Sequence, residues 1–583
     1  MDALQLTRAA LRSEALDAVI VPTADPYLSE YVAPCWALRA HLSGFEGSAG
    51  VLCVAADFAA LSVDSRYWVQ AEKTLVDGVE LLRAERDPLK EATSHLLKSL
   101  SSGARVAIDP RLVSHEAFDG VSSVLAAAGI ELLGCDVFEK HPEIWPERPS
   151  PVVSAVRPMK RPGVDARVKL AVLRQTLESE ATDAVLLTSL DEIAWLTNLR
   201  GRDVPCNPVF GAVMLVRSDR AELFSESVRF DETARSALAA SGIELREPEA
   251  LGAALQALEG STLLLDPRRT SHAYVRSTAH VCVRHGASPV AAMKSHKSPA
   301  ELELIREAML KDGIALAEFY AELEERLVAG ERLTECDVVE MLHAWRTKDP
   351  EFLEESFETI CAFGPNAALP HYQPHRGEDA RIEGNGLLLI DSGAQYECGT
   401  TDITRMTAVG EPSAAMKADV ALVTAGMLRL LGCRFPEGTK GSQIDAFARY
   451  DLWQAGCDFG HGTGHGVGYV LNVHEGPCGI SPRASEPLGL GNVISDEPGL
   501  YRPGYWGVRV ENLIAVVDGG TTPFGRFLRT EPLTCLPVDV RTLPKDFPMR
   551  EALNRFNAAC ARRLRPHLSE RARRWLSRAA KPL

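Results

Sequence analysis

Two short stretches of this sequence occur twice, in the same order and at nearly the same spacing. The stretch SEALDAV at residues 13–19 returns as SEATDAV at 179–185, and DPRLVSH at 109–115 returns as DPRRTSH at 266–272. Two landmarks that keep their order and spacing indicate two copies of one domain. A solenoid needs about three or more stacked repeats, so duplication of a globular domain is the interpretation that remains.

Each copy shows the pattern of an α/β domain. A helical stretch precedes an apolar run, at 18–21 in the first copy and 184–187 in the second, and another apolar run follows at 106–108 and 263–265. Apolar strands that alternate with helical stretches are typical of α/β folds. The predicted fold class is therefore mixed α/β (α+β), with one small domain built twice ahead of a third, unrelated region.

Two boundaries separate these regions. The proline-rich stretch WPERPSP at 145–151 lacks backbone donors and is predicted to be a linker. The second boundary lies close to Ser298, because Ser298, Pro299 and Glu301 have the residue types of a helix N-cap, a first helical position and a capping box. We therefore predict domains at residues 1–150, 151–296 and 297–583.

The overall charge argues against one class of partner. The formal net charge is −16, which disfavours binding to nucleic-acid backbones. Residues 541–583 are an exception, since they hold 12 Lys and Arg but 3 Asp and Glu. We interpret this basic tail as a solvated helical face that lies on an acidic body.

The cellular compartment is predicted from sequence features that would direct a protein elsewhere. No apolar run reaches the ~18 residues of a membrane span, and the N-terminal stretch has no long apolar core of a signal peptide. The 13 cysteines are scattered and form no C-x-x-C pair. We therefore expect reduced thiols and a cytoplasmic protein that binds no membrane.

Two aspartates of the third region are predicted to approach each other. The apolar run 387–390 leads to Asp391, and after a turn flanked by glycines the residues 400–404 return as a second strand that carries Asp402. A hairpin would place these carboxylates side by side. Adjacent carboxylates repel each other, so neither ionises easily without a cation between them. Turn capping is the alternative for either aspartate alone.

A glycine-rich segment supplies histidines. The string HGTGHGVG at 461–468 places His461 and His465 among four glycines, and His474 follows closely. Glycine lets the backbone and ligands approach each other closely. A lone histidine would more often be a plain hydrogen-bonding residue, but this string is much more specific than that.

Further along, two more acidic side chains complete the pattern. The string DEPG carries Glu497, and a strand predicted over 507–512 points Arg509 and Glu511 to one face. A buried Arg and Glu need partners, and a metal ion would neutralise the glutamate.

Together these residues form a candidate metal site. Four carboxylates and one imidazole suit hard divalent ions, with Mn²⁺, Co²⁺ and Zn²⁺ all compatible. Five ligands suit two ions that share bridging carboxylates, and such a pair lowers the pKa of a water held between them. The candidate ligands are Asp391, Asp402, His465, Glu497 and Glu511.

At these residues the chain resembles the pita-bread metallopeptidases, and within them the long, three-domain Xaa-Pro aminopeptidases. The resemblance covers almost the whole chain, although DSRYW has Ser65 where that family is expected to have glycine. The strings that carry it are SEYVAP, SGFEGSAG and DSRYW in the first domain, LDEIAWLTNLRG and NPVF in the second, and IDSGAQY, GTTDITR, HGTGHGVG, LNVHEGPCGIS, DEPGLY, VRVEN and EPLT in the third.

The resemblance implies an architecture and an activity. Two creatinase-like α/β domains would precede a pita-bread catalytic domain that removes an N-terminal residue standing before proline. Two divalent ions would be required, most often Mn²⁺, with Zn²⁺ or Co²⁺ as alternatives. The expected assembly is a homodimer formed through the catalytic domain, and the expected partners are peptides with proline in the second position.

The resemblance also distributes the ligands between the two ions. Asp391 would bind one ion, His465 and Glu497 the other, and Asp402 and Glu511 both. Glu497 would also act as the general base and pass the proton to the leaving proline nitrogen.

Other side chains would meet the substrate. His371, His461 and His474 match histidines that contact substrate and stabilise developing charge, and Arg509 is a further substrate-binding candidate. Arg66 follows the apolar segment 58–63, and residues at strand ends commonly carry function, so we predict that it contributes to the substrate entrance. A salt bridge within its own domain is the alternative for Arg66.

Two other functions compete with this interpretation. A prolidase would cleave only dipeptides that end in proline, but the duplicated N-terminal region and the HGTGHGVG string argue against it. A non-catalytic binding protein on the same scaffold would have lost metal ligands, and here every ligand position is filled.

Overall fold

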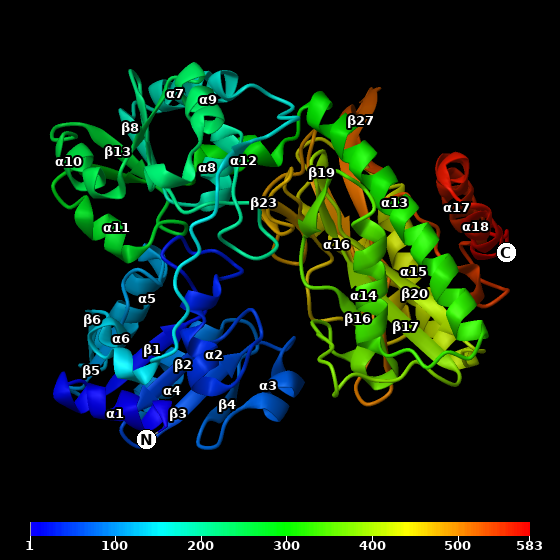
Figure 1. Ribbon diagram of the computed structural model, residues 1–583, viewed down its shortest axis with the longest axis horizontal. Helices are drawn as coiled ribbons and strands as arrows, with labels where there is room; N and C mark the ends of the chain where they lie inside the picture. Colours follow the sequence, from blue (N-terminus) through cyan, green and yellow to red (C-terminus); the bar gives the residue numbers. More distant parts are fainter. Residues whose placement is uncertain (1) are drawn as a thin grey trace. The chain divides into compact units, whose positions relative to one another are not determined.

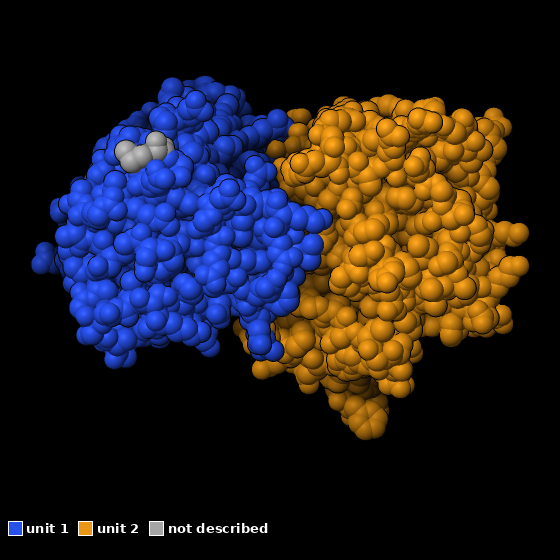
Figure 2. All heavy atoms as spheres, turned by 90° about the horizontal axis from the view of Figure 1, so that it is seen from below, with its two compact units in different colours: residues 1–159, 165–290 blue, residues 160–164, 291–583 orange. Residues whose placement is uncertain are grey.

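The computed structural model describes residues 2–583, which form two compact units (Figure 2). The first unit consists of the residues up to 159 together with 165–290, and the second of 160–164 and 291–583. Among residues 2–583 no helix has the length and apolar character that crossing a bilayer requires.

The first unit contains two six-stranded sheets with the same topology (Figure 1). The order β4-β3-β2-β1-β5-β6 in one sheet corresponds strand for strand to β12-β11-β10-β8-β13-β14 in the other. In each sheet the central strand, β1 or β8, has an antiparallel neighbour on one side and a parallel neighbour on the other. The predicted duplication is therefore confirmed. The strands are β1 (Ala18–Pro22), β2 (Val51–Ala55), β3 (Ala59–Val63), β4 (Glu80–Arg83), β5 (Arg105–Ile108), β6 (Glu131–Gly134), β8 (Ala184–Leu187), β10 (Val213–Arg217), β11 (Ala221–Phe224), β12 (Ile243–Arg246), β13 (Thr262–Leu265) and β14 (Cys282–His285), with a short pair β7 (Arg157–Pro158) and β9 (Leu199–Arg200).

The repeated sequence has the same local structure in both copies. Ala15 and Ala181 both adopt the left-handed backbone conformation directly after the first helix of their copy. Two residues later an aspartate begins the central strand region, and its carboxylate accepts a backbone hydrogen bond from the neighbouring strand. Asp17 accepts from the Arg105 nitrogen at 2.8 Å, and Asp183 accepts from the Thr262 nitrogen at 2.7 Å.

Both faces of each sheet are covered by helices, which explains why the strands read as continuous apolar runs. In the first sheet, Val19 and Val21 pack into one core cluster, whereas Ile20 packs into the cluster on the opposite face. The helices up to the unit boundary are α1 (Ala3–Ser13), α2 (Leu38–Ser43), α3 (Trp68–Thr74), α4 (Pro88–Ser99), α5 (His115–Ala126), α6 (Val137–Lys140), α7 (Ala166–Ser179), α8 (Leu190–Thr197), α9 (Glu232–Ala240), α10 (Leu251–Gln256), α11 (His272–Ser277) and α12 (Pro289–Ser295).

The longest helix of the second unit starts where the sequence predicted. The Ser298 hydroxyl accepts from the Glu301 nitrogen at 3.2 Å, and the Glu301 carboxylate accepts from the Ser298 nitrogen at 2.8 Å, which completes a capping box. Pro299 stands at the first helical position. The helices of this unit are α13 (Pro299–Val328), α14 (Glu335–Arg346), α15 (Ala414–Leu431), α16 (Gly441–Gln454), α17 (Arg550–Leu564) and α18 (Glu570–Ala579).

The strands of the second unit form a mainly antiparallel core behind these helices. The largest sheet has the order β21-β28-β27-β24-β22-β23, and smaller sheets have the orders β16-β17-β20, β15-β18-β19 and β25-β26. The strands are β15 (Phe352–Glu355), β16 (Ile360–Phe363), β17 (Gly386–Ser392), β18 (Ala394–Tyr396), β19 (Gly399–Thr400), β20 (Ile403–Val409), β21 (Arg434–Pro436), β22 (Gly464–Gly466), β23 (Glu475–Ile480), β24 (Val493–Asp496), β25 (Gly499–Arg502), β26 (Trp506–Arg509), β27 (Asn512–Thr522) and β28 (Gly525–Pro532).

The basic tail lies on an acidic helix, as its composition predicted. α18 packs against α13 (Figure 1), and the Trp575 ring stacks on Tyr320 with a centroid separation of 5.5 Å. Arg578 pairs with Glu324 at 2.6 Å. Arg541 and Arg571 of the tail also pair with glutamates of α13.

Candidate metal centre

The two aspartates lie on the hairpin that the sequence predicted, with one difference. β17 pairs antiparallel with β20, and Asp391 stands opposite Thr404. The returning strand predicted over 400–404 is interrupted, because β19 ends at residue 400 and β20 begins at residue 403. The break coincides with Thr401, whose hydroxyl accepts from the Ala394 nitrogen at 2.9 Å. Asp402 lies within this break, directly ahead of β20.

His465 joins the acidic residues from β22. One ligand atom from each of Asp402, His465 and Glu511 lies within 4.8 Å of the other two. The His465 Nε2 atom is 3.5 Å from Asp402 Oδ2 and 3.3 Å from Glu497 Oε1. Four of the five predicted ligands, Asp402, His465, Glu497 and Glu511, therefore lie close enough together to surround bound cations.

The orientation of His465 is set by its other nitrogen. Nδ1 lies 2.9 Å from the Gly466 carbonyl oxygen, which can only accept, so Nδ1 carries the proton. Nε2 then faces the carboxylates and, when it carries no proton, offers its lone pair to a metal ion. Metal-bound histidines commonly have their second nitrogen fixed in this way.

Asp391 is held by Arg509. Arg509 Nη2 and Nε lie 2.5 Å and 3.1 Å from the same oxygen, Asp391 Oδ2. The single strand predicted over 507–512 is wrong in detail, because β26 ends at Arg509 and β27 begins at Asn512. The residues between them leave the ladder, and the Glu511 nitrogen bonds to the Thr404 carbonyl oxygen at 3.1 Å. Both side chains nevertheless reach the same site, as predicted.

The site contains carboxylate oxygens that the protein itself leaves unpaired. Asp391 has one oxygen held by Arg509, and Glu511 has Oε2 held by the Thr404 hydroxyl at 2.7 Å. The other oxygens, Asp391 Oδ1 and Glu511 Oε1, are buried and have no hydrogen-bond partner among residues 2–583. Buried carboxylate oxygens without a partner are costly, so these residues fit a group of bound cations.

The protonation behaviour of the site leads to the same conclusion. Burial raises the pKa of Asp402 and of Glu511 well above the usual range, and the charges of neighbouring carboxylates add to the effect. Burial would also raise the pKa of Glu497, but the hydrogen bond with His465 lowers it to about 2. That same bond outweighs burial at His465 and raises its pKa to about 9. Four acidic side chains at one buried point match the four positive charges of two divalent ions.

The first histidine of the glycine-rich string is linked to the ligands by hydrogen bonds. His461 Nδ1 donates to the Gly462 carbonyl oxygen at 2.7 Å, and Nε2 accepts from the Tyr501 hydroxyl at 2.8 Å. The Tyr501 oxygen in turn accepts from Arg509 at 2.8 Å. Burial lowers the pKa of His461 to about 4, so this histidine is neutral near pH 7 and connects through Tyr501 and Arg509 to Asp391.

The remaining predicted residues have different surroundings. The His474 ring stands edge-on to His465, with centroids 4.3 Å apart, which places it beside the ligand cluster. His371 lies half-buried in the turn after the helical turn η5 (Gly364–Ala368), in the loop that the sequence predicted. Arg66, in the first unit, forms a bidentate pair with Asp64, at 2.8 Å through Nε and 2.7 Å through Nη2.

Several supporting residues were not assigned a role from the sequence. Asp445 and Arg449 are buried on α16 and pair at 2.8 Å. Asp445 accepts from the Thr463 hydroxyl at 2.6 Å, and Arg449 donates to the His461 carbonyl oxygen at 2.9 Å. This pair therefore braces the backbone of the glycine-rich string. The i,i+4 spacing of Asp445 and Arg449 was the available signal, but it did not reveal the target.

The glycines of that string are required by close packing. A Cβ atom on Gly464 would overlap the Ser495 carbonyl oxygen, and one on Gly466 would overlap the Glu475 carbonyl oxygen. β22 therefore fits between its neighbours only with glycine on both sides of His465.

Asp496 is a second residue that the sequence did not single out for the site. It is fully buried beside Glu497, and neither of its carboxylate oxygens has a partner among residues 2–583. Burial raises its pKa well above the usual range, with the charges of Glu511 and Glu497 contributing.

Three known families match successive parts of the chain. Residues 303–518 match Metallopeptidase family M24, and residues 4–139 and 146–301 each match a Creatinase/Prolidase N-terminal domain. The two N-terminal matches coincide with the two copies of the duplicated sheet, and the M24 match contains every candidate metal ligand.

Relatives are similar over nearly the full length. Aminopeptidase P2 of Arabidopsis thaliana is 37% identical, over 97% of this chain and 86% of its own length. A protein of Pyricularia oryzae described as a probable Xaa-Pro aminopeptidase P is 38% identical, over 88% of this chain and 87% of its own length.

Solved structures show the same architecture. The X-prolyl aminopeptidase of Caenorhabditis elegans, described as a cytosolic enzyme with a di-nuclear active site, matches with a TM-score of 0.94 and 30% identity. That match covers 100% of this chain and 99% of the other. An Xaa-Pro dipeptidase from Bacillus anthracis matches with a TM-score of 0.52 and 25% identity, but covers only 64% of this chain.

Proposed function

The chain belongs to the Xaa-Pro aminopeptidases of metallopeptidase family M24, and on this premise we propose that it releases the N-terminal residue of peptides whose second residue is proline, using two divalent ions. The observation that carries the proposal is the convergence of Asp402, His465 and Glu511 in the M24 region, beside buried carboxylate oxygens that the protein leaves unpaired.

The candidate ligands can be assigned to the two ions, and for Asp391 the assignment follows from which of its oxygens has no hydrogen bond. Asp391 would offer Oδ1 to one ion, because Arg509 holds Oδ2. His465 and Glu497 would hold the other ion, and Asp402 and Glu511 would serve both. When bound, the ions polarise the peptide carbonyl and lower the pKa of a water. The oxygen-rich ligand set favours Mn²⁺, with Zn²⁺ and Co²⁺ as alternatives.

The protein's own residues then position the substrate and move the proton. Glu497 would accept a proton as general base and pass it to the leaving proline nitrogen. Neutral His461 would meet the substrate by exchanging the hydrogen bond between its Nε2 and Tyr501 for one to the substrate, with His371 and His474 as further contacts. Arg509 acts on the site through Asp391, and Arg66 contributes to the entrance for longer peptides.

The surrounding architecture supports an aminopeptidase more than a prolidase. The Xaa-Pro dipeptidase covers 64% of this chain, whereas the aminopeptidase P relatives span both N-terminal copies as well as the catalytic region. We propose the division into 1–150, 151–296 and 297–583 for these three domains, although the compact units divide six residues earlier, after residue 290. A cytoplasmic location is supported by the description of the Caenorhabditis elegans enzyme as cytosolic.

A homodimer through the catalytic domain is supported by an aromatic face on α16. Phe447, Tyr450 and Trp453 are 44%, 50% and 49% exposed. Their spacing of three residues places them on neighbouring turns of one helix face. Aromatic side chains are enriched in the cores of protein interfaces, so this face is the proposed contact with a second copy.

The deciding experiment is a digest of peptides that begin Arg-Pro, with the chain first reconstituted with Mn²⁺ and the products read by mass. We expect free arginine from a dipeptide, a tripeptide and a nonapeptide alike. A prolidase would act on the dipeptide alone. A binding protein on this scaffold would leave all three peptides intact with any of the three metals, and either result would overturn the proposal.

A further inference from the structure

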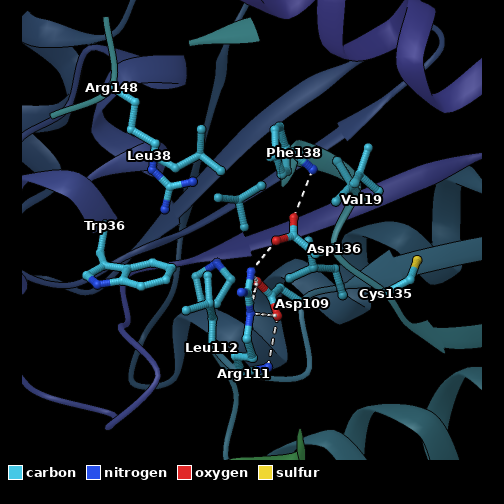
Figure 3. A pocket seen from close by; sticks show the side chains of 14 residues that line it. Val19, Trp36, Leu38, Asp109, Arg111, Leu112, Cys135, Asp136, Phe138 and Arg148 are labelled. Carbon is cyan, nitrogen blue, oxygen red and sulfur yellow. Dashed lines mark hydrogen bonds and ion pairs between the residues drawn. The ribbon is translucent and has the colours of Figure 1, made fainter. Parts of the chain in front are cut away.

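The repeated DPR-x-x-SH string is not used by the catalytic centre, and its first half has a local structural role. The Asp109 carboxylate accepts from the Arg111 nitrogen at 2.9 Å, and in the second copy the Asp266 carboxylate accepts from the Arg268 nitrogen at 3.0 Å. Figure 3 shows the Arg111 side chain between Asp109 and Asp136, so its charge is already matched. The aspartate and arginine of the string therefore organise a turn.

The second half of the string joins the two copies to each other. The His115 nitrogen donates to the Thr270 carbonyl oxygen at 3.0 Å, and the His272 nitrogen donates to the Val113 carbonyl oxygen at 3.0 Å. These reciprocal bonds place equivalent residues of the duplicated domain face to face. Both histidines stand at the first position of a helix, α5 in one copy and α11 in the other.

The two histidine rings meet at this seam. The Nδ1 atoms of His115 and His272 are 3.1 Å apart, and Nε2 of His115 is 3.4 Å from Oδ2 of Asp119, one turn further along α5. One ligand atom from each of these three residues lies within 4.8 Å of the other two. A third imidazole, that of His285, stands edge-on to His115 with centroids 5.2 Å apart.

We propose that His115, His272 and Asp119 bind a divalent transition-metal ion of the zinc class at the seam between the two N-terminal copies. Two imidazoles and one carboxylate are a common zinc ligand set. Bonds of ~2.0–2.1 Å in a tetrahedral site place ligand atoms about 3.3 Å apart, and the Nδ1 atoms of His115 and His272 are already 3.1 Å apart. The ligand atom of Asp119 lies within 4.8 Å of theirs, and this side chain would turn toward the ion. The fourth position is open to water or to His285.

The surroundings favour the neutral imidazole that a metal requires. The Phe118 ring stacks on His272 with centroids 3.6 Å apart. Burial lowers the pKa of His272, and the neighbouring His115 contributes to the effect. Asp119 is largely exposed, with 59% of its side chain accessible, so an ion can enter from solvent. Because the ligands come from both copies, a bound ion would tie the two domains together, without any part in peptide hydrolysis.

The test counts metal in the full-length holoenzyme. Wild type and the variants His272→Asn, Asp119→Asn and Glu116→Gln are dialysed against the same buffered free zinc, and total metal per chain is measured by mass spectrometry. Glu116 is an exposed acid on the same helix that belongs to no ligand set, so Glu116→Gln is the matched control for loss of one negative charge.

We expect His272→Asn and Asp119→Asn each to hold one ion per chain fewer than wild type and Glu116→Gln, with cleavage of Arg-Pro peptides unchanged in all three variants. The zinc-dependent rise in melting temperature should also shrink in the first two variants only. Equal metal content in wild type, His272→Asn and Asp119→Asn would overturn the proposal. So would the same loss in Glu116→Gln, because the effect would then reflect charge alone. Asp119→Asn alters an exposed side chain, which keeps the comparison valid if His272→Asn fails to fold.

Discussion

Arg509 donates two hydrogen bonds to a single oxygen of Asp391, through Nη2 at 2.5 Å and Nε at 3.1 Å. Both partners are buried, and the second oxygen of Asp391 is left without a partner. The pair lies 118 residues apart in the chain. Arg509 therefore fixes which oxygen of Asp391 remains available to a metal ion.

Replacing Arg509 with leucine should weaken metal binding by about 10–100-fold, because partners that orient a metal ligand typically have effects of this size. Activity should fall by a similar factor at limiting Mn²⁺ and recover in part when Mn²⁺ is raised. Metal affinity by equilibrium dialysis measures the effect. Arg502→Leu is the matched control, since Arg502 makes an equivalent bidentate pair with Asp419 at 2.5 Å and 2.7 Å on the same hairpin. Unchanged affinity in Arg509→Leu would show that Asp391 is oriented by other means.

Asp402→Ala and Glu511→Ala should each abolish activity and loosen metal binding. A bridging carboxylate serves both ions, and its loss also removes one of the negative charges that hold them. Metal content after dialysis gives the result directly. Asp518→Ala is a suitable control, because Asp518 is exposed on β27 in the same sheet as His465. Two tightly bound ions per chain in either ligand variant would contradict the assignment.

His461→Ala and His371→Ala should lower turnover while both ions are retained. His461 contacts Tyr501 and the Gly462 carbonyl oxygen, and neither of its ring nitrogens faces the ligand cluster. A kcat decrease of about 10²–10⁴-fold is the range for loss of a group that acts in proton transfer or charge stabilisation. Tyr501→Phe should reproduce part of the His461 effect, because it removes the hydrogen bond that Nε2 accepts from the Tyr501 hydroxyl. Loss of an ion in either histidine variant would identify that residue as a ligand.

The candidate metal ligands could be singled out from the sequence because each lies in a short, distinctive string. Asp391 ends an apolar strand, and His465 stands between glycines that only a crowded strand requires. The side chains that hold these candidate ligands and their loops in position could not be predicted in the same way. Nothing in the residues around Arg509 indicates that it reaches Asp391, and nothing near Asp445 indicates that it supports Thr463. These contacts depend on how separate sheets and helices pack.

The predicted strands lie where the sequence placed them, but the structure interrupts two that were predicted to be continuous. Residues 400–404 and 507–512 are predicted as unbroken β segments, yet each contains a break at a candidate metal ligand, Asp402 in one and Glu511 in the other. The alternation of residue types along a strand does not show that a carboxylate has to leave the β-ladder to reach the site. Duplication was visible as repeated strings, but the meeting of His115 with His272 was not, because a repeat specifies two similar folds and leaves the contact between them undetermined.

The aromatic face of α16 should control assembly. Trp453→Asp places a charge at the proposed dimer contact, where desolvating it costs more than the lost contact alone. We expect sedimentation to report a dimer for wild type and a monomer for the variant, with metal content unchanged. Val328→Asp is the control, since Val328 is 82% exposed at the end of α13. A wild-type monomer, or a dimeric Trp453→Asp, would contradict the proposed contact.

Replacing Arg66 can distinguish its proposed role at the substrate entrance from a purely structural role in its salt bridge with Asp64. Its guanidinium pairs with Asp64, two residues earlier, and packs over the Tyr67 ring at 5.2 Å. Such a pair closes only a local turn, and partly exposed pairs contribute about 0–1 kcal/mol to stability. If Arg66 serves the entrance, Arg66→Ala should raise KM for longer peptides more than for dipeptides, while the melting temperature barely changes. Arg111→Ala is the matched control, because Arg111 makes the same Asp-x-Arg pair with Asp109 in the same domain. A large drop in melting temperature for Arg66→Ala, or equal KM changes for short and long substrates, would favour the structural salt bridge.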